Sequence, residues 1–431
     1  MSHKTPAAAL PKRGFGPVLA NRSFLVMWLG QVFSQTADKL VFILLVSIVG
    51  ALSTSPVLMS TALALQASPS VLLGAVAGVL VDRWDKRTAM IITNLLRALL
   101  AVALGLWGHL NLALAIALAF LISCCAQPFI PAEAAAMPLV VERDNLLAAN
   151  SLFATTMIGS IIVAFTLGEP LIQLAGLKDA SLLTGIGFAI SVVFLYFMRY
   201  TQPDTRAGEH EAFLDQLKDG FGYIRETPPI RQTLWQQVAL FAMFAAMSVV
   251  AILFAKNELH TNFSWFLATA GIGMGLGSWV LGHFGHHWNK NHVIVTGFVG
   301  NGLVLGVLAF LGAQYVLPAF GVSLLLGLAS SLVAVPLQTR LQELVPEAKR
   351  GKVFGAQNMV LNIATTLPIA AVGFVVAAIG LRPVLGVTSA LMLVAGALTW
   401  YVFRKNPPPG PILGTGGISQ AAVPKEPGAS V

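Results

Sequence analysis

Charged residues are scarce in this chain, and their scarcity excludes a water-soluble globular protein. Asp, Glu, Lys and Arg make up 10% of the 431 residues, whereas hydrophobic residues make up 56%. A soluble globular domain carries about 25% charged residues. The main solvent of this chain is therefore expected to be the hydrocarbon core of a membrane.

Cysteine is almost absent, and so are the motifs of most enzymes. The only cysteines, Cys124 and Cys125, are neighbours in an apolar run, which excludes a disulfide framework and a metal site of the usual spacing. We expect both to be buried thiols. The sequence also has no phosphate-binding loop and no nucleophile–base pair, so we expect no enzymatic step, no cofactor and no metal.

The positive charge of the chain is not arranged for nucleic acid. The formal net charge is +8, but the basic residues stand in short clusters between apolar runs, without a basic stripe or an aromatic platform. We expect no nucleic-acid partner and interpret these clusters as topology signals. Of the 26 Lys and Arg residues, 21 fall in the terminal segments and alternate loops, whereas only Lys178, Lys256 and Arg382 fall in the remaining loops. This asymmetry places both termini in the cytoplasm.

Long apolar runs are abundant, and each is near the ~20 residues that an α-helix needs to cross about 30 Å of hydrocarbon. Six lie on each side of a polar central segment. They predict an all-α polytopic membrane protein with twelve transmembrane helices in two pseudo-symmetric six-helix bundles. The runs are Phe24–Gly50, Val57–Val81, Thr88–Gly108, Leu110–Ile130, Leu146–Ile172, Ala180–Met198, Leu234–Ala255, Phe263–Phe284, Val293–Leu311, Tyr315–Leu337, Val360–Ile379 and Pro383–Phe403.

Composition divides the chain into five parts. A cytoplasmic N-terminal segment (1–23) precedes the first bundle (24–200), and a cytoplasmic linker (201–231) leads to the second bundle (232–405). The tail (406–431) is rich in Gly, Pro and Ala and is predicted to be disordered. In the linker, Phe213, Leu214, Leu217, Phe221 and Ile224 recur at helical spacing. They predict a short amphipathic helix that either lies on the membrane surface or is simply solvated.

An internal repeat relates the two halves. Gly78–Arg87 aligns with Gly282–Asn291 at an offset of 204, and Pro131–Glu142 aligns with Pro336–Glu347 at an offset of 205. An even number of spans separates the copies, so both halves run in the same direction. This is the pattern of parallel repeats related by an axis along the membrane normal.

The first copy of this repeat carries a family motif. Gly-x-x-x-Asp-(Arg/Lys)-x-Gly-(Arg/Lys)-(Arg/Lys) is matched by Gly78, Asp82, Arg83, Lys86 and Arg87, with Asp85 in place of the usual glycine. This motif and the twelve spans in two parallel halves are both typical of the major facilitator superfamily, which the chain resembles over nearly its whole length. The resemblance implies the major facilitator fold and a cytoplasmic gate, in which Asp82 and the bases bind the other half. The alternative is that these charges only set topology.

Within that superfamily, three segments are similar to the macrolide-efflux and siderophore-export group of bacterial drug:proton antiporters. These are Pro131–Glu133, Leu139–Arg143 and Ala148–Asn150. This resemblance implies proton-coupled export of a small amphipathic solute across the bacterial inner membrane by a monomer. Its partners would be the small-molecule or lipid-like substrate, H⁺ and membrane lipid. Gln31–Asp38 is similar to the first helix of lysophospholipid transporters, which gives the alternative substrate class, and a membrane enzyme or receptor is a third reading.

Ionisable residues within the apolar runs are the candidate site. Asp38 and Lys39 lie about 21 Å into the first run and Arg97 about 14 Å into the third, measured from the same side of the membrane. Such residues normally face the bundle interior or a wet cavity. We predict that Asp38 pairs with Arg97 and changes protonation or partner during transport, while Lys39 faces the cavity. The alternative is a static salt bridge.

Two glutamates are further coupling candidates. Glu169 stands at the outer end of the fifth run and Glu133 at the inner end of the fourth. Either could bind a transported proton, or simply face interfacial water. The glycine run Gly271–Gly277 lies inside an apolar span with no preceding strand, so we expect it to pack helices rather than bind a dinucleotide.

Overall fold

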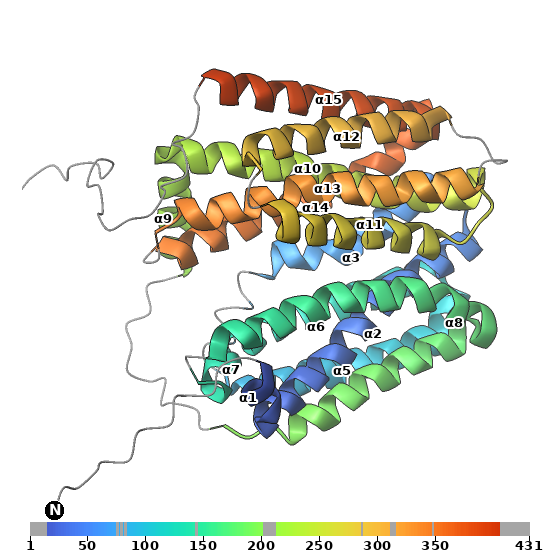
Figure 1. The fold of residues 1–431 in the computed structure, drawn as a ribbon. Coiled ribbons are helices and arrows are strands. Elements are labelled where there is room, and N and C mark those ends of the chain that lie inside the picture. Colours follow the sequence, from blue (N-terminus) through green and yellow to red (C-terminus); the bar gives the residue numbers. More distant parts are fainter. Residues whose placement is uncertain are drawn as a thin grey trace, which may run out of the picture.

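The fold is described from a computed structural model of the chain, which describes residues 15–74, 77, 81, 84–142, 145–200, 213–285, 288–310, 316–346 and 349–405. The regular elements in this part of the chain are helices. They form two bundles that lie side by side, and the axes of their helices are roughly parallel (Figure 1).

The first bundle contains the elements before the linker. They are α1 (Phe15–Ala20), α2 (Arg22–Leu52), α3 (Pro56–Leu72), α5 (Lys86–Trp107), α6 (Leu112–Ala126), α7 (Phe129–Val140) and α8 (Leu146–Tyr196). The long α8 is two helices joined by a bend at Gly176, which has φ 81° and ψ 165°. A residue with a Cβ is strained at such a positive φ, so glycine permits the chain to reverse there.

The second bundle follows helix α9 (Phe213–Glu226). Its elements are α10 (Pro228–Leu253), a π-helical turn (Phe254–Glu258), α11 (Phe263–Phe284), α12 (Lys290–Phe310), α13 (Val316–Leu344), α14 (Arg350–Ile379) and α15 (Leu381–Lys405). Ten helical stretches of the described chain are long and apolar enough to cross a membrane. The stretch containing α8 bends at Gly176 and supplies two spans, and α3 is a shorter apolar helix, so the predicted twelve-helix architecture is confirmed.

The helices begin where the sequence provides caps. The side chain of Asn21 accepts hydrogen bonds from the backbone N–H groups of Ser23 and Phe24 at 3.0 and 3.2 Å, so α2 starts at Arg22, two residues before the expected Phe24. Asn111 caps α6 in the same way. Such caps satisfy amides that have no partner within the helix.

Exposed tryptophans mark the two ends of the spans. Trp84 and Trp288 lie at the end where α9 is found, called here the linker end, and Trp107 and Trp265 lie at the opposite far end. Tryptophan concentrates at membrane–water interfaces because its ring is apolar while its N–H is polar. The positions of these rings fit a bundle that crosses the bilayer from the linker end to the far end.

Helix α9 is present as the linker pattern predicts, but its apolar face does not lie on the membrane. Leu217 and Ile224 are buried against Leu341 of α13 and Val353 of α14, so the second bundle covers this face. Lys352 donates a hydrogen bond to Asp219 at 2.8 Å. The expectation of a surface-bound helix was wrong because periodicity shows that a helix has an apolar face without showing what covers it.

The glycine run of α11 packs helices, as expected. A Cβ on Gly273 or Gly277 would collide with the backbone of α13 near Leu324 and Leu328. Glycines at this spacing let two membrane helices approach closely.

Candidate functional site

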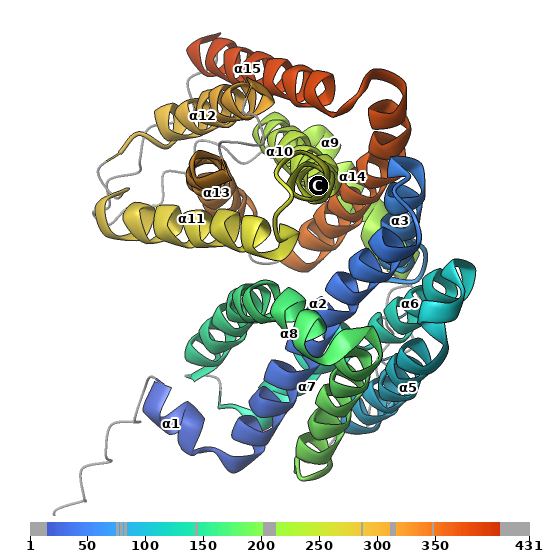
Figure 2. The same cartoon turned by 90° about the vertical axis from the view of Figure 1, so that its right-hand side faces the viewer.

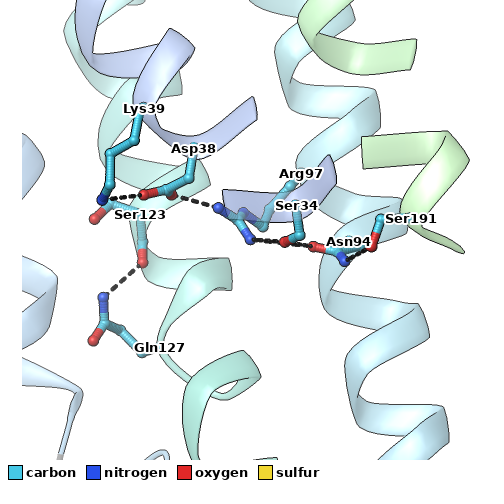
Figure 3. Close-up of polar contacts among 8 residues, drawn as sticks. All are labelled: Ser34, Asp38, Lys39, Asn94, Arg97, Ser123, Gln127 and Ser191. Carbon is cyan, nitrogen blue, oxygen red and sulfur yellow. Dashed lines mark hydrogen bonds and ion pairs between the residues drawn. The ribbon is translucent and has the colours of Figure 1, made fainter. Parts of the chain in front are cut away.

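The centre of the first bundle holds an ion pair between Asp38 of α2 and Arg97 of α5. One guanidinium nitrogen of Arg97 donates to Oδ1 of Asp38 (Figure 3). Arg97 is almost fully buried, with 3% of its side chain exposed, whereas Asp38 is 31% exposed. A buried cation in a membrane costs several kcal/mol unless it is paired. The pair predicted from the sequence is present, and Asp38 is its more exposed member.

Arg97 has further partners that the sequence reading missed. Its other guanidinium nitrogen donates to Oγ of Ser34 and to Oδ1 of Asn94, each at 3.1 Å. Asn94 in turn donates to Oγ of Ser191 on α8 at 2.8 Å, and the ring of Phe188 lies 4.2 Å from the guanidinium carbon. This network joins α2, α5 and α8 around one charge. Its signal is helical spacing: Ser34 precedes Asp38 by four residues, and Asn94 precedes Arg97 by three.

Lys39 also binds Asp38. Its Nζ lies 3.2 Å from Oδ2 of Asp38, on the opposite side of the carboxylate from Arg97 (Figure 3). Lys39 was expected to face a cavity, and it is one of the residues that line the cavity described below. Consecutive helical residues differ in direction by about 100°, so Lys39 and Asp38 leave α2 on different sides. The sequence reading missed that both cations share one carboxylate, which leaves the cluster with one excess positive charge.

A cavity of about 380 Å³ adjoins this cluster, and its lining comes mainly from helices of the first bundle. Asp38 and Lys39 line it, and most of its remaining wall is apolar, including Phe42 of α2 and Phe165 of α8. Ile369 of α14 contributes from the second bundle. The arrangement is a mostly apolar chamber with one charged wall, which suits an amphipathic ligand.

Glu133 lies apart from the Asp38 cluster. Its side chain is 5% exposed on α7, and its Oε1 atom is buried without a hydrogen-bond partner among the described residues. An ionised carboxylate in such a place costs several kcal/mol. Among the described residues, Glu133 is therefore a buried acid that does not belong to the Asp38 cluster.

Glu169 joins the bundles at the far end. Its Oε2 accepts a hydrogen bond from the backbone N–H of Ser264, in the first turn of α11, at 3.1 Å. Two further hydrogen bonds cross between the same helices, from Trp265 to the carbonyl of Thr166 and from Gln173 to Asn262. The carboxylate also lies in the field of Lys256 and at the positive end of the α11 dipole. Glu169 is thus an interbundle contact.

Helices α3 and α14 also join the two bundles by a close contact, and together with the bonds between α8 and α11 this contact closes the far end. A Cβ on Gly373 of α14 would collide with Ser60 and with the carbonyl of Pro56 on α3. Figure 2 looks at the molecule from the far end, where α3 and α14 lie against one another. In Figure 1 the bundles diverge toward the linker end, where α7 and α9 lie.

The motif after α3 is only partly within the described residues. Gly78, Asp82 and Arg83 lie outside them, whereas Lys86 and Arg87 are described. Lys86 donates to the carbonyls of Val81 and Trp84, and Arg87 donates to the carbonyls of Leu195 and Tyr196 at the end of α8. Both bases therefore bind carbonyls of their own bundle here, and the interbundle gate stays a prediction.

Asp85, which replaces the usual glycine of the motif, has a local role. It caps α5 by accepting from the backbone N–H of Thr88 at 2.7 Å, and it accepts a hydrogen bond from Tyr200 at 2.7 Å. Burial alone would raise the pKa of Asp85, but the bonds from Thr88 and Tyr200 hold that pKa below its ordinary value. Burial and the bond to Asp85 raise the pKa of Tyr200 to about 12.

Cys124 and Cys125 correct a further expectation. Both are free thiols and both are only partly buried, on α6. Neighbouring residues on a helix point in different directions, and Ile122 and Ala119 take the buried side of α6.

Sequence comparison identifies the family to which this architecture belongs. The profile described as Major Facilitator Superfamily matches residues 27–367 and 238–427. The chain belongs to the major facilitator superfamily, and it is a multi-pass membrane transporter, not an enzyme.

Two curated relatives come from Bacillus subtilis (strain 168). The Uncharacterized MFS-type transporter YfiS is 26% identical over 403 residues, covering 89% of this chain and 94% of its own. The Uncharacterized MFS-type transporter YvqJ is 23% identical over 346 residues, covering 76% and 80%.

Solved structures show the same fold. The crystal structure of nucleoside transporter NupG matches with a TM-score of 0.69 at 12% identity, covering 88% of this chain and 99% of that one. A point mutant of NupG matches with a TM-score of 0.70, covering 89% and 100%.

Proposed function

We propose that this transporter is a proton-coupled exporter, working as a monomer, that moves a small amphipathic solute by alternating access. The linker end faces the cytoplasm in this proposal, as the distribution of Lys and Arg predicts. The observation that carries it is the Lys39–Asp38–Arg97 cluster, of which Lys39 and Asp38 line a cavity that Ile369 of the second bundle also reaches.

The cluster can respond to a proton because one carboxylate serves two cations. Protonation of Asp38 removes the charge that holds both Lys39 and Arg97. Arg97 keeps its bonds to Ser34 and Asn94, so it stays in place, while Lys39 becomes free to address a ligand in the cavity. A solute with a negative or strongly polar group and an apolar body then fits the charged wall and the apolar remainder.

Closure of the far end supports the alternating-access part of the proposal. The bonds between α8 and α11 and the α3–α14 contact hold one end shut, so opening toward that end requires them to break. Glu169 carries the only ionisable side chain in those three hydrogen bonds, which makes it a second proton-sensitive point. Glu133, buried without a partner for Oε1 among the described residues, is the third candidate proton site.

The substrate group rests on resemblance and on the chemistry of the cavity. The similarity of Pro131–Glu133 and its neighbours to macrolide and siderophore exporters supports a small amphipathic solute. The names of the two bacterial relatives state no substrate, and the likeness to NupG is one of fold alone.

A lysophospholipid transporter or flippase is the second candidate. The observation that favours it is the pairing of Asp38 and Lys39, which presents both signs of charge beside an apolar wall. A zwitterionic headgroup and a single acyl chain have the complementary pattern.

One reconstitution experiment separates these candidates. Vesicles containing the purified chain would be given labelled macrolides, siderophores or lysophosphatidylethanolamine, with and without an imposed proton gradient. Gradient-dependent movement of a macrolide or siderophore supports the exporter, whereas movement of the lysolipid alone supports the second candidate. Movement of any solute that is indifferent to the gradient contradicts proton coupling.

A further inference from the structure

A groove of about 460 Å³ runs along the second bundle, away from the Asp38 cavity. Its walls are α10 and α15, and its floor is Phe298 of α12, which is fully buried. Trp235 and Leu398 lie at the mouth, where they are 67% and 59% exposed. Because α15 has a broad exposed apolar face on a membrane-spanning helix, we infer that the groove opens to lipid.

Two amide groups in this groove have unmet hydrogen-bonding capacity. The buried Nε2 of Gln232 and the buried Oε1 of Gln236 have no partner among the described residues. Gln236 is 92% buried, and its Nε2 donates to Thr399 of α15 at 3.3 Å. An unmatched buried polar group costs about 1–3 kcal/mol. Two such residues in the lining of a mostly apolar groove therefore indicate a ligand that supplies polar atoms.

The equivalent position in the first bundle, between α2 and α8, is closely packed. Gln31-Val32 of α2 and Gln237-Val238 of α10 correspond at an offset of 206, and both glutamines are buried. At the same offset, Gly30 of α2 is the residue equivalent to Gln236 of α10. A Cβ on Gly30 would lie 3.1 Å from Leu195, so α2 packs tightly on α8. In the second bundle the polar Gln236 replaces that contact, and the space between α10 and α15 stays open.

The position and charge of the groove identify its occupant. From Arg231 to Ala239 its residues on α10 span about 12 Å at 1.5 Å per residue, which is close to half of a 30 Å hydrocarbon core. The exposed guanidinium of Arg231 lies at the linker end of the groove, where its Nη1 donates to the carbonyl of Arg225. The groove therefore spans one leaflet and has a cation at the level of the headgroups.

We propose that this groove binds one phospholipid molecule of the linker-side leaflet. Its phosphate is bound by Arg231 and Gln232, and its glycerol ester region meets the free amide atom of Gln236. One acyl chain lies over Phe298, between α10 and α15. An amide can offer either its oxygen or its nitrogen, so Gln236 can match an acceptor once Thr399 becomes the donor. The site is separate from the transport cavity and does not depend on the proposed substrate.

The test uses the full-length chain in detergent and native mass spectrometry, with phosphatidylglycerol as the probe. Wild type is expected to retain one phosphatidylglycerol. The double variant Gln232→Leu/Gln236→Leu keeps the volume of the groove and loses its polar atoms, so its affinity should fall about tenfold or more. Arg231→Gln should weaken binding in the same direction, and because Arg231 is exposed, this variant is expected to fold even if the double variant does not.

Two comparisons make the result decisive. Arg22→Gln removes a cation from the start of α2, where α2 packs closely on α8, and it should bind phosphatidylglycerol as wild type does. Diacylglycerol has the same tails without the phosphate and should bind about tenfold more weakly. Equal retention by wild type and both groove variants, or equal affinity for diacylglycerol, would overturn the assignment.

Discussion

Glu169 of the first bundle accepts a hydrogen bond from the backbone N–H of Ser264 in the second bundle, at 3.1 Å. The contact is made at the N-terminus of α11, where an anion is favoured by the free amides and by the helix dipole. A residue considered from the sequence as a proton site is therefore also a contact between the halves. Its protonation and the opening of the far end are physically linked, because a neutral carboxyl accepts this bond more weakly.

Glu169→Ala should open the far end. The variant removes a hydrogen bond to a charged acceptor, worth about 1.5–3 kcal/mol, which shifts a two-state equilibrium by roughly 10- to 150-fold. Spin labels at the exposed positions Leu174 of α8 and Leu317 of α13 would report the far-end distance. Glu169→Gln is the matched variant, because it can still accept from Ser264 but cannot titrate. Because its neutral amide oxygen accepts the bond more weakly than a carboxylate does, it should open the far end less than Glu169→Ala, and the part of the pH dependence of transport that Glu169 contributes should disappear. An unchanged pH profile would remove Glu169 from proton coupling.

Gly373→Ala should act on the same closure through packing. The added methyl group meets Ser60 and Pro56 of α3, so α3 and α14 must separate. Overpacking of this kind typically costs about 1–3 kcal/mol, and the spin-label pair should show a wider far end. The control is Gly321→Ala on α13, where a Cβ meets nothing within 4 Å. If both substitutions behave alike, the α3–α14 contact does not hold the far end closed.

Tyr200 should ionise later than the other tyrosines. Its pKa is raised to about 12 from an ordinary value of 10.0. Because the folded pKa is the higher one, the stability it contributes is present below pH 10 and is lost as the pH rises through about 12. The difference in phenolate absorbance between wild type and Tyr200→Phe isolates this group among the five tyrosines. Titration of Tyr200 near pH 10 would contradict the bond to Asp85.

The stability that Asp85 contributes to the same contact depends on pH in the opposite direction. The pKa of Asp85 is held below its ordinary value of 3.8, so its stabilising contribution is present above that pH and is lost as the pH falls through the lower folded value. Asp85→Ala removes both the α5 cap and the acceptor of Tyr200, and should cost about 1 kcal/mol in thermal unfolding. An unaltered melting temperature would mean that the cap is redundant.

Asp82→Asn tests the gate that the family motif implies. Asp82 lies outside the described residues, and the described bases Lys86 and Arg87 bind carbonyls of their own bundle. We expect the variant to insert and fold normally but to transport much more slowly, since losing an interbundle charge shifts the state equilibrium by about 1–3 kcal/mol. Normal transport would reduce the motif to a topology signal.

The sequence predicted features that depend on hydropathy and on the cost of buried charge. Spans follow from the length of apolar runs, and the Asp38–Arg97 pair follows because a deep arginine needs a partner. Lys39 sharing the same carboxylate did not follow, since side-chain rotamers decide how many cations reach one acid. Contacts between the bundles were also missed. No sequence pattern links Ser264 to Glu169, because that contact depends on how the two bundles pack against each other.

The groove along α10 shows a further limit of the sequence. Gln232 and Gln236 are ordinary polar residues near the start of an apolar run, and the run itself was expected to begin only at Leu234. Their unmet hydrogen bonds become visible only when the neighbouring α15 is in place. The apolar face of α9 was likewise predicted correctly as a face, while its cover by α13 and α14 required the structure.

In the proposed mechanism, the Asp38–Arg97 pair takes part in proton coupling. The most direct measurement is proton-gradient-driven flux of the labelled macrolide or siderophore that wild type transports, in vesicles containing Asp38→Asn or Asp38→Asn/Arg97→Gln. Asp38→Asn leaves Arg97 buried without a counter-charge and should lose flux while remaining folded, with stability lowered by about 3–5 kcal/mol. The double variant should regain stability but not flux. Full flux in the double variant would show that the pair is structural and that the coupling site lies elsewhere.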